Sequence, residues 1–126
     1  MLTSSCGSTK NVNVINTLTQ NSWVVNSLLG KQLDSSAYLK GLPSINFGAD
    51  GKLTGSTGCN NFTGNFKLDG MGVNLDPGAM TKMACPGNGE ADFLSALQQV
   101  TNLKLNGNTL SLLNGANEVL SLIPKK

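Results

Sequence analysis

The sequence predicts an α+β domain: a strongly curved antiparallel sheet, or partly open β-barrel, of about 7–8 short strands with one amphipathic α-helix. Asparagine and glycine are abundant, and both favour tight turns and short strands. Asp50-Gly51, Asn106-Gly107 and Asn114-Gly115 separate short alternating runs, and both residues of each pair tolerate the positive φ of a hairpin turn. Only residues 89–101 carry apolar side chains at helical spacing. A curved sheet that closes around this helix, or is covered by it, accounts for both patterns.

The expected strands follow one another from Trp23 onward. Residues 23–29 are rich in β-branched and aromatic side chains, and residues 44–47 alternate between polar and apolar as a half-buried strand does. A further short strand is expected at residues 12–15. The later strands are expected at residues 52–55, 64–69, 73–75, 103–105, 109–113 and 118–123.

The expected helix spans about residues 89–101. Asn88 is placed to cap its first turn, and Glu90 and Asp92 lie where the helix macrodipole favours carboxylates. Because these two carboxylates are two positions apart on a helix, they point to different faces, and helix stabilisation explains them better than glycoside hydrolysis. The apolar stripe of the helix consists of Phe93, Leu94, Leu97 and Val100.

The composition bounds the number of domains and excludes several kinds of partner. With 126 residues, the chain is expected to form one domain at residues 21–126, preceded by a flexible polar tether at residues 1–20. All nine basic residues are lysines, and histidine and arginine are absent. The side chains most used for bidentate phosphate binding and for proton transfer near neutral pH are therefore missing. The formal net charge of +2 is spread along the chain, so the sequence predicts no concentrated positive surface for binding nucleic acid.

The N-terminal sequence around Cys6 is similar to the end of a bacterial lipoprotein signal. Small residues precede this cysteine and a flexible polar segment follows it, as at sites where cleavage before cysteine leads to lipidation. Leu2 lies one residue further from Cys6 than is usual, and no charged or apolar signal segment precedes it, which is expected of a chain that starts within its signal. Cys6 is therefore the lipidation candidate, and the alternative is an ordinary cysteine near the N-terminus.

Cys59 and Cys85 are the candidate disulfide. Each lies in a turn-like segment, and a bond between them would close a loop of about 27 residues, worth on the order of 3–3.5 kcal/mol. The pairing is expected if the chain is exported, because disulfides persist in oxidising compartments. The alternative is two buried thiols that pack as small apolar groups.

The sequence offers few candidate residues for a catalytic, metal or phosphate site. A nucleophilic Cys85 has no histidine as its base, and Lys82 would first have to be desolvated to serve instead. A zinc site needs about four ligands, but only Cys59 and Cys85 are cysteines within the body of the domain. The glycines of residues 55–64 lack the Lys-Ser/Thr ending of a phosphate-binding loop. We therefore expect no enzyme activity, no metal and no cofactor.

Two motifs precede the expected helix, one at residues 58–64 and one at residues 81–86, and their structural residues are Gly58, Asn60, Phe62, Gly64, Thr81, Met83 and Pro86. Together with the helix they resemble the META domain family, which is typified by heat-shock-inducible, HslJ-like lipoproteins of the bacterial envelope. The resemblance runs from about residue 20 to residue 123. It implies a curved antiparallel sheet or partly open barrel with one helix, an envelope location, and no established catalytic residues. Lys82 departs from the pattern, because many members have arginine there.

The stretch GSTGCNNFTGNF at residues 55–66 is interpreted as a corner of this fold. Its glycines permit backbone conformations and close approaches that larger residues do not. Asn60 is expected to hydrogen-bond the amides of the loop, and Phe62 and Phe66 are expected to anchor either side of it in the core. The alternative is a direct ligand site.

The leading functional hypothesis is a non-enzymatic, lipid-anchored domain of the bacterial cell envelope, on the periplasmic side, with a stress-related role or action through protein contacts. It implies an envelope protein as partner, a membrane tether through Cys6, no nucleic acid, and a monomer by default. The alternative is a small apolar-ligand or lipid-binding module with a pocket between the helix and the curved sheet. That pocket would be lined by Phe47, Phe66, Phe93, Leu94 and Leu97.

Overall fold

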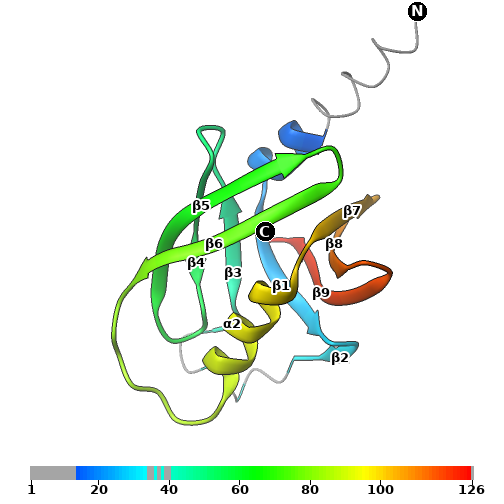
Figure 1. The fold of residues 1–126 in the computed structure, drawn as a ribbon. Helices are drawn as coiled ribbons and strands as arrows, with labels where there is room; N and C mark the ends of the chain where they lie inside the picture. Colours follow the sequence, from blue (N-terminus) through cyan, green and yellow to red (C-terminus); the bar gives the residue numbers. More distant parts are fainter. Residues whose placement is uncertain (1–13, 34–35, 37, 39–40, 126) are drawn as a thin grey trace, which may run out of the picture.

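The computed structural model describes residues 14–33, 36, 38 and 41–125. Within them, one antiparallel sheet of nine strands curves into a ring, and two helices accompany it (Figure 1). The predicted α+β class is confirmed, with nine strands where about 7–8 were expected. The strands are β1 Ser22–Leu28, β2 Lys31–Gln32, β3 Ser44–Phe47, β4 Lys52–Ser56, β5 Asn61–Asp69, β6 Gly72–Met80, β7 Asn102–Asn106, β8 Thr109–Asn114 and β9 Asn117–Pro124. The helices are α2 Gly89–Gln99 and a first helix described over residues 14–20.

The sheet closes because its first long strand pairs with its last. The strand order is β2-β1-β3-β4-β5-β6-β7-β8-β9, and β1 additionally pairs with β9. In this pairing Val24 lies opposite Ile123 and Val25 opposite Leu122. The turns β3–β4, β5–β6, β7–β8 and β8–β9 each contain an Asp-Gly or Asn-Gly step, whose glycine supplies a positive φ.

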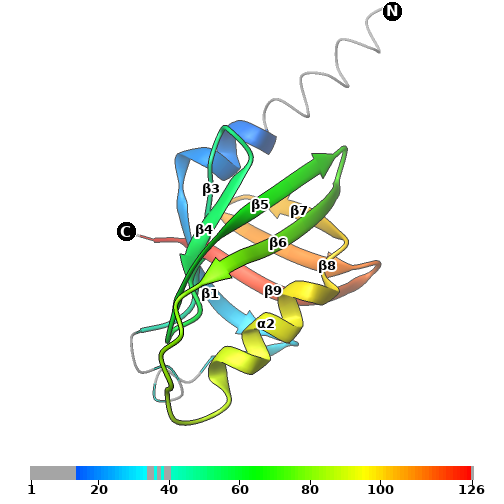
Figure 2. The ribbon, with the colours of Figure 1, turned by 60° about the vertical axis from the view of Figure 1, so that its left-hand side comes forward.

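The ring is weakest between β6 and β7, which share a single residue pair, Gly72 with Asn102. One of the backbone hydrogen bonds there runs from the N–H of Val73 to the oxygen of Thr101, at 2.9 Å. Beyond this point the two strands diverge. Helix α2 contacts both β6 and β9, and Figure 2 shows it running alongside the ring there. The sheet is therefore strongly curved and ring-like, with one seam.

The core fills the inside of this ring. Along β5 the exposed and buried side chains alternate, which places Phe62 and Phe66 inside and the asparagines of the strand outside. Phe66 packs edge-on against Phe47, with ring centroids 5.1 Å apart, and Phe62 lies 6.2 Å from Phe93 of α2. These aromatic contacts join the β3–β4–β5 side of the sheet to the helix.

The chain before β1 is helical where a strand was expected. Residues 14–20 form a helix, so the strand predicted at residues 12–15 is wrong for its described part. Leu18 is fully buried, and its carbonyl oxygen accepts a hydrogen bond of 3.1 Å from Nε1 of Trp23. Burial of this leucine and the indole bond fix the segment against the core, so part of the segment assigned to the tether lies within the fold.

Helix α2 agrees with its prediction except at its ends. It stops at Gln99, before the expected residue 101, because Val100 has extended backbone at φ −72° and ψ 127°. The side chain of Asn88 makes no capping hydrogen bond, contrary to expectation; only its backbone oxygen accepts the N–H of Asp92, at 2.9 Å. Glu90 and Asp92 do lie in the first turn.

Candidate functional site

Four polar side chains meet where the β4–β5 turn, the loop that precedes α2 and α2 itself come together. They are Thr57, Asn60, Thr81 and Glu90, here called the polar node. Thr57 and Asn60 are buried, with 0% and 3% of their surface exposed. Such burial of polar groups requires that they be hydrogen-bonded, and within the described residues no buried side-chain nitrogen or oxygen lacks a partner.

The turn between β4 and β5 shapes one side of the polar node. The hydroxyl oxygen of Thr57 accepts the backbone N–H groups of Asn60, at 2.9 Å, and of Cys59, at 3.2 Å. Gly58 has a φ of +90°, and a Cβ on it would collide with the side chain of Tyr38. The turn therefore needs both a hydroxyl at residue 57 and glycine at residue 58.

Asn60 is the centre of the polar node, because both ends of its amide are used. Its Oδ1 accepts the hydroxyl of Thr81 at 2.9 Å and the backbone N–H of Met83 at 2.6 Å. Its Nδ2 donates to the backbone oxygen of Met83 at 3.0 Å and to Oε2 of Glu90 at 2.7 Å. The side chain thus binds the backbone of Met83 much as a neighbouring strand would, and ties this loop to α2.

Glu90 connects the polar node to the helix. Its Oε2 accepts hydrogen bonds from Thr57, at 2.6 Å, and from Asn60, at 2.7 Å. Asp92 lies elsewhere, beside a hollow of about 340 Å³ that Leu28 and Tyr38 also line. The two carboxylates therefore lie in different surroundings on α2, as their spacing on the helix predicts. Burial, and secondly the charge of Asp92, raise the pKa of Tyr38 above 10.0.

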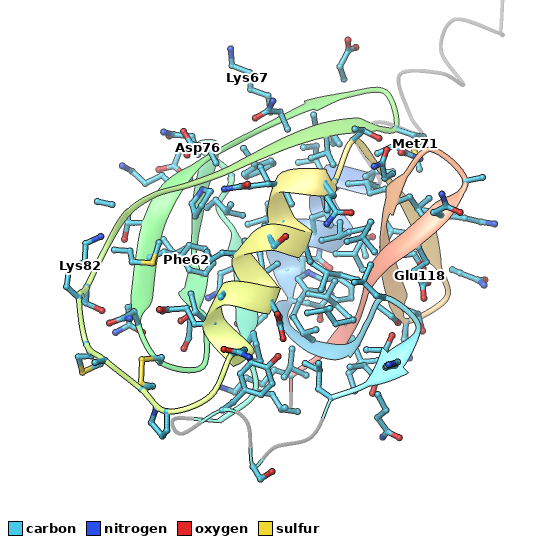
Figure 3. All side chains as sticks on the ribbon, turned by 60° about the horizontal axis from the view of Figure 1, so that its bottom comes forward. Phe62, Lys67, Met71, Asp76, Lys82 and Glu118 are labelled. Carbon is cyan, nitrogen blue, oxygen red and sulfur yellow. A yellow bond between two sulfur atoms is a disulfide. The ribbon has the colours of Figure 1, made fainter. Side chains whose placement is uncertain are left out.

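A disulfide between Cys59 and Cys85 lies beside the polar node, with 6.1 Å between the two Cα atoms. Cys85 belongs to residues 81–88, here called the motif loop, in which most side chains are exposed. Met83 is 42% exposed although the amide of Asn60 holds its backbone, and Figure 3 shows Lys82 pointing away from the body of the domain. A hollow of about 120 Å³ beside the disulfide is lined in part by Pro86. The bond and Asn60 together fix an exposed loop.

The remaining motif residues lie in the sheet. Gly64 lies against the backbone of β6, and a Cβ on it would collide with the backbone oxygen of Asp76. Phe62 is buried next to Phe93. The stretch at residues 55–66 therefore forms a corner of the fold, and in it Asn60 contacts the motif loop and α2 in addition to its own turn.

The five apolar side chains proposed to line a pocket pack mainly into the core. Phe47, Phe93 and Leu97 are buried there, and Leu94 packs against the same cluster. Phe66 is also buried, and of the five it alone borders one of the more prominent surface hollows of the described chain. These side chains therefore account for core packing between α2 and the sheet.

Sequence reasoning missed Thr57 as a member of the polar node and gave Glu90 only a role in the first turn of α2. A threonine followed by Gly-Cys-Asn is typical of a turn in which the hydroxyl binds backbone amides, and this signal could have identified Thr57. Cys6 lies outside the described residues. In the part of the chain that the structure covers, no three metal-ligating side chains gather, and neither helix has the length and apolar character to cross a bilayer.

Comparison with known proteins agrees with this geometry. The family model of the META domain matches residues 16–126. One similar solved structure, determined by NMR, is 27% identical with a TM-score of 0.68 and covers 87% of this chain and 93% of its own. A DUF4847 family protein from Bacteroides vulgatus is 20% identical, with a TM-score of 0.68 and coverages of 90% and 98%. A protein from Burkholderia xenovorans is 19% identical, with a TM-score of 0.67 and coverages of 90% and 88%.

The latter two structures support the fold alone, because their identity to this chain is low. Among curated proteins no match is found. The family match extends over the polar node, the disulfide and nearly all of the ring. The chain belongs to the META domain family.

Proposed function

We propose that the chain is a non-enzymatic domain of the bacterial cell envelope, held at a membrane by lipid on Cys6 and acting through protein contacts in a stress-related role. The observation that supports it most is the disulfide between Cys59 and Cys85. Disulfides form and persist in secreted and periplasmic proteins and are rare in the cytosol. The bond therefore favours export, and the lipoprotein-like sequence around Cys6 offers a means of retaining an exported chain at a membrane.

The groups that could act chemically at the motifs are engaged in structural bonds, which favours a non-enzymatic role. Cys85 is oxidised, so it offers no thiolate for which Lys82 could serve as base. Oε2 of Glu90 accepts two hydrogen bonds, from Thr57 and Asn60. In this arrangement the carboxylate positions the turn and the helix relative to each other.

The motif loop favours action through protein contacts. Most of its side chains are exposed, while Asn60 and the disulfide hold its backbone. A loop that is already rigid loses little conformational entropy when a partner binds. Lys82 and Met83 present a positive charge and an apolar side chain next to each other on this surface.

The test uses the full-length natural gene product, expressed in bacteria and separated into membrane, periplasmic and cytosolic fractions. We expect it in the membrane fraction, with the mass of a lipid-modified cysteine and no alkylatable thiol at Cys59 or Cys85. Cys6→Ser should abolish the lipid-modified mass with the disulfide intact, and the matched control Ser5→Ala should keep that mass. An unmodified cytosolic protein with free thiols would contradict the proposal.

The stress-related role has a separate test in cells that lack the gene. Restoring the natural gene should improve survival after heat shock. A variant with Lys82→Ala and Met83→Ser should accumulate at the membrane to the same level but fail to restore survival, because these changes remove the charge and the apolar side chain that the motif loop presents to a partner. Full rescue by this variant would contradict a role for the motif loop in protein contacts.

The apolar-ligand alternative makes a different prediction for the same material. A lipid retained by the purified domain would be found in an organic extract by mass spectrometry, at about one molecule per chain. The burial of Phe47, Phe93 and Leu97 in the core favours an empty extract.

A further inference from the structure

The outer surface of the β5–β6 hairpin carries a polar hollow that none of the motif residues borders. Its volume is about 550 Å³, within the range of roughly 300–1,000 Å³ that is usual for small-molecule sites. We call it the outer hollow. The residues that border it are Asp50, Gly51, Asn65, Phe66, Lys67, Asn74 and Asp76. Figure 3 shows Lys67 and Asp76 on the outside of this hairpin, away from α2.

Strand register brings these polar side chains together. Asn65 lies directly opposite Asp76, and Lys67 directly opposite Asn74. Side chains of such directly opposed residues are about 5 Å apart at Cβ. The turn before β4 adds Asp50 from the other side, since the backbone oxygen of neighbouring Gly51 accepts the N–H of Phe66 at 2.9 Å.

The outer hollow is partly pre-organised and partly free to bind. Oδ1 of Asp50 accepts the backbone N–H of Lys52 at 3.2 Å, and Oδ1 of Asp76 accepts that of Gly78 at 3.0 Å. Each carboxylate is thereby oriented by one oxygen. Among the described residues, the side chains of the other polar members, Asn65, Lys67 and Asn74, have no hydrogen bond or ion pair.

We propose that the outer hollow is a binding site for a neutral oligosaccharide. Sugar hydroxyls both donate and accept, and they match two side-chain amides that do the same, two carboxylates that accept and one ammonium that donates. The site is fixed on paired strands, which limits the entropy lost on binding. The proposal does not depend on export or on lipidation of Cys6.

Other ligand classes fit the outer hollow less well. Two carboxylates and one ammonium give it a formal charge of −1, which disfavours phosphate and acidic polymers. Apolar ligands find only Phe66, which is 7% exposed.

The test is an NMR titration of ¹⁵N-labelled protein with cellotetraose, maltotetraose and chitotetraose, each up to about 10 mM, which detects dissociation constants of about 1 mM or tighter. At least one sugar should produce saturable shifts in the side-chain amides of Asn65 and Asn74 and in the backbone amides around them. The variant Asn65→Ala with Asn74→Ala should weaken binding by at least about tenfold, because each lost hydrogen bond weakens it severalfold.

Asn61→Ala is the matched control, because Asn61 is exposed on the same face of β5 but does not line the outer hollow. Its affinity should equal that of the natural protein. The proposal is overturned if none of the three sugars gives saturable shifts, or if the double variant binds as well as the control. It is also overturned if inorganic phosphate produces the same shifts, which would assign the hollow to anions.

Discussion

Replacement of Asn60 by alanine should destabilise the domain more than any other single change in the polar node. The substitution removes the four hydrogen bonds that the amide makes to other segments: to the hydroxyl of Thr81, to the backbone N–H and oxygen of Met83, and to the carboxylate of Glu90. The motif loop then loses the bonds that tie Met83 to the turn and the helix, and it is still held by the disulfide and by the hydrogen bonds between Thr81 and Asn61.

The magnitude follows from these bonds. A typical net contribution is about 0.5–1.5 kcal/mol for a neutral hydrogen bond and about 1.5–3 kcal/mol for one to a charged group such as Glu90. Water will replace part of what the motif loop loses, because Met83 is 42% exposed. We therefore expect Asn60→Ala to lower the free energy of unfolding by about 3–5 kcal/mol, which is a large share of the roughly 5–15 kcal/mol usual for a domain.

Urea denaturation without reductant measures this loss, with the fluorescence of Trp23 as the probe, since it is the chain's single tryptophan and is fully buried. With an m-value of about 2 kcal/mol/M, the midpoint should fall by about 2 M at unchanged slope. Asn61→Ala, the change of an exposed neighbour, should stay within about 0.5 kcal/mol of the natural protein. A loss below about 1 kcal/mol for Asn60→Ala would refute the assignment of Asn60 as the centre of the node.

Three further predictions concern the sheet, the disulfide and the tyrosine. Gly64→Ala should lower the free energy of unfolding by at least about 3 kcal/mol, because the new Cβ would collide with the backbone of β6. Gly107→Ala, at a turn with open space and φ 62°, should lower it by only about 1–2 kcal/mol. Thermal denaturation of the two variants side by side measures the difference. The double variant Cys59→Ser, Cys85→Ser should have a free energy of unfolding that is lower by on the order of 3.5 kcal/mol. The natural protein with its disulfide reduced should unfold at the same urea concentration as this variant. Because the pKa of Tyr38 is raised on folding, its contribution to stability is fully present below pH 10.0 and is lost as the pH rises through the raised value. Tyr38→Phe should flatten that alkaline decline, and the absorbance of tyrosinate follows the titration of this single tyrosine.

Local signals in the sequence predicted most of the ring. Asp50-Gly51 and Asn106-Gly107 form hairpin turns as expected, because a tight turn is decided by the φ angles that a few neighbouring residues tolerate. Phe62 and Phe66 were expected to anchor the corner at residues 55–66 in the core, and both are buried. The strand expected at residues 64–69 begins earlier, at Asn61, and alternation along β5 places both side chains inside.

The contacts of the polar node could not be predicted in the same way. Asn60 was expected to bind the amides of its own turn, but its partners Met83 and Glu90 are 23 and 30 residues away in sequence. Such pairs are determined by how β5, the motif loop and α2 are brought together in space. The helix at residues 14–20 escaped prediction for a related reason: it is stabilised by packing of Leu18 against the core and by the bond from Trp23, which outweigh a weak local preference.

The pairing of β1 with β9 has a consequence for how the chain folds as it is synthesised. Residues near position 24 cannot gain their neighbours near position 123 until almost the whole chain has left the ribosome. The ring therefore cannot close progressively from the N-terminus. The apolar faces of hairpins that form earlier stay uncovered until the last strand is available. A chain with this topology completes its core only when its last strand arrives.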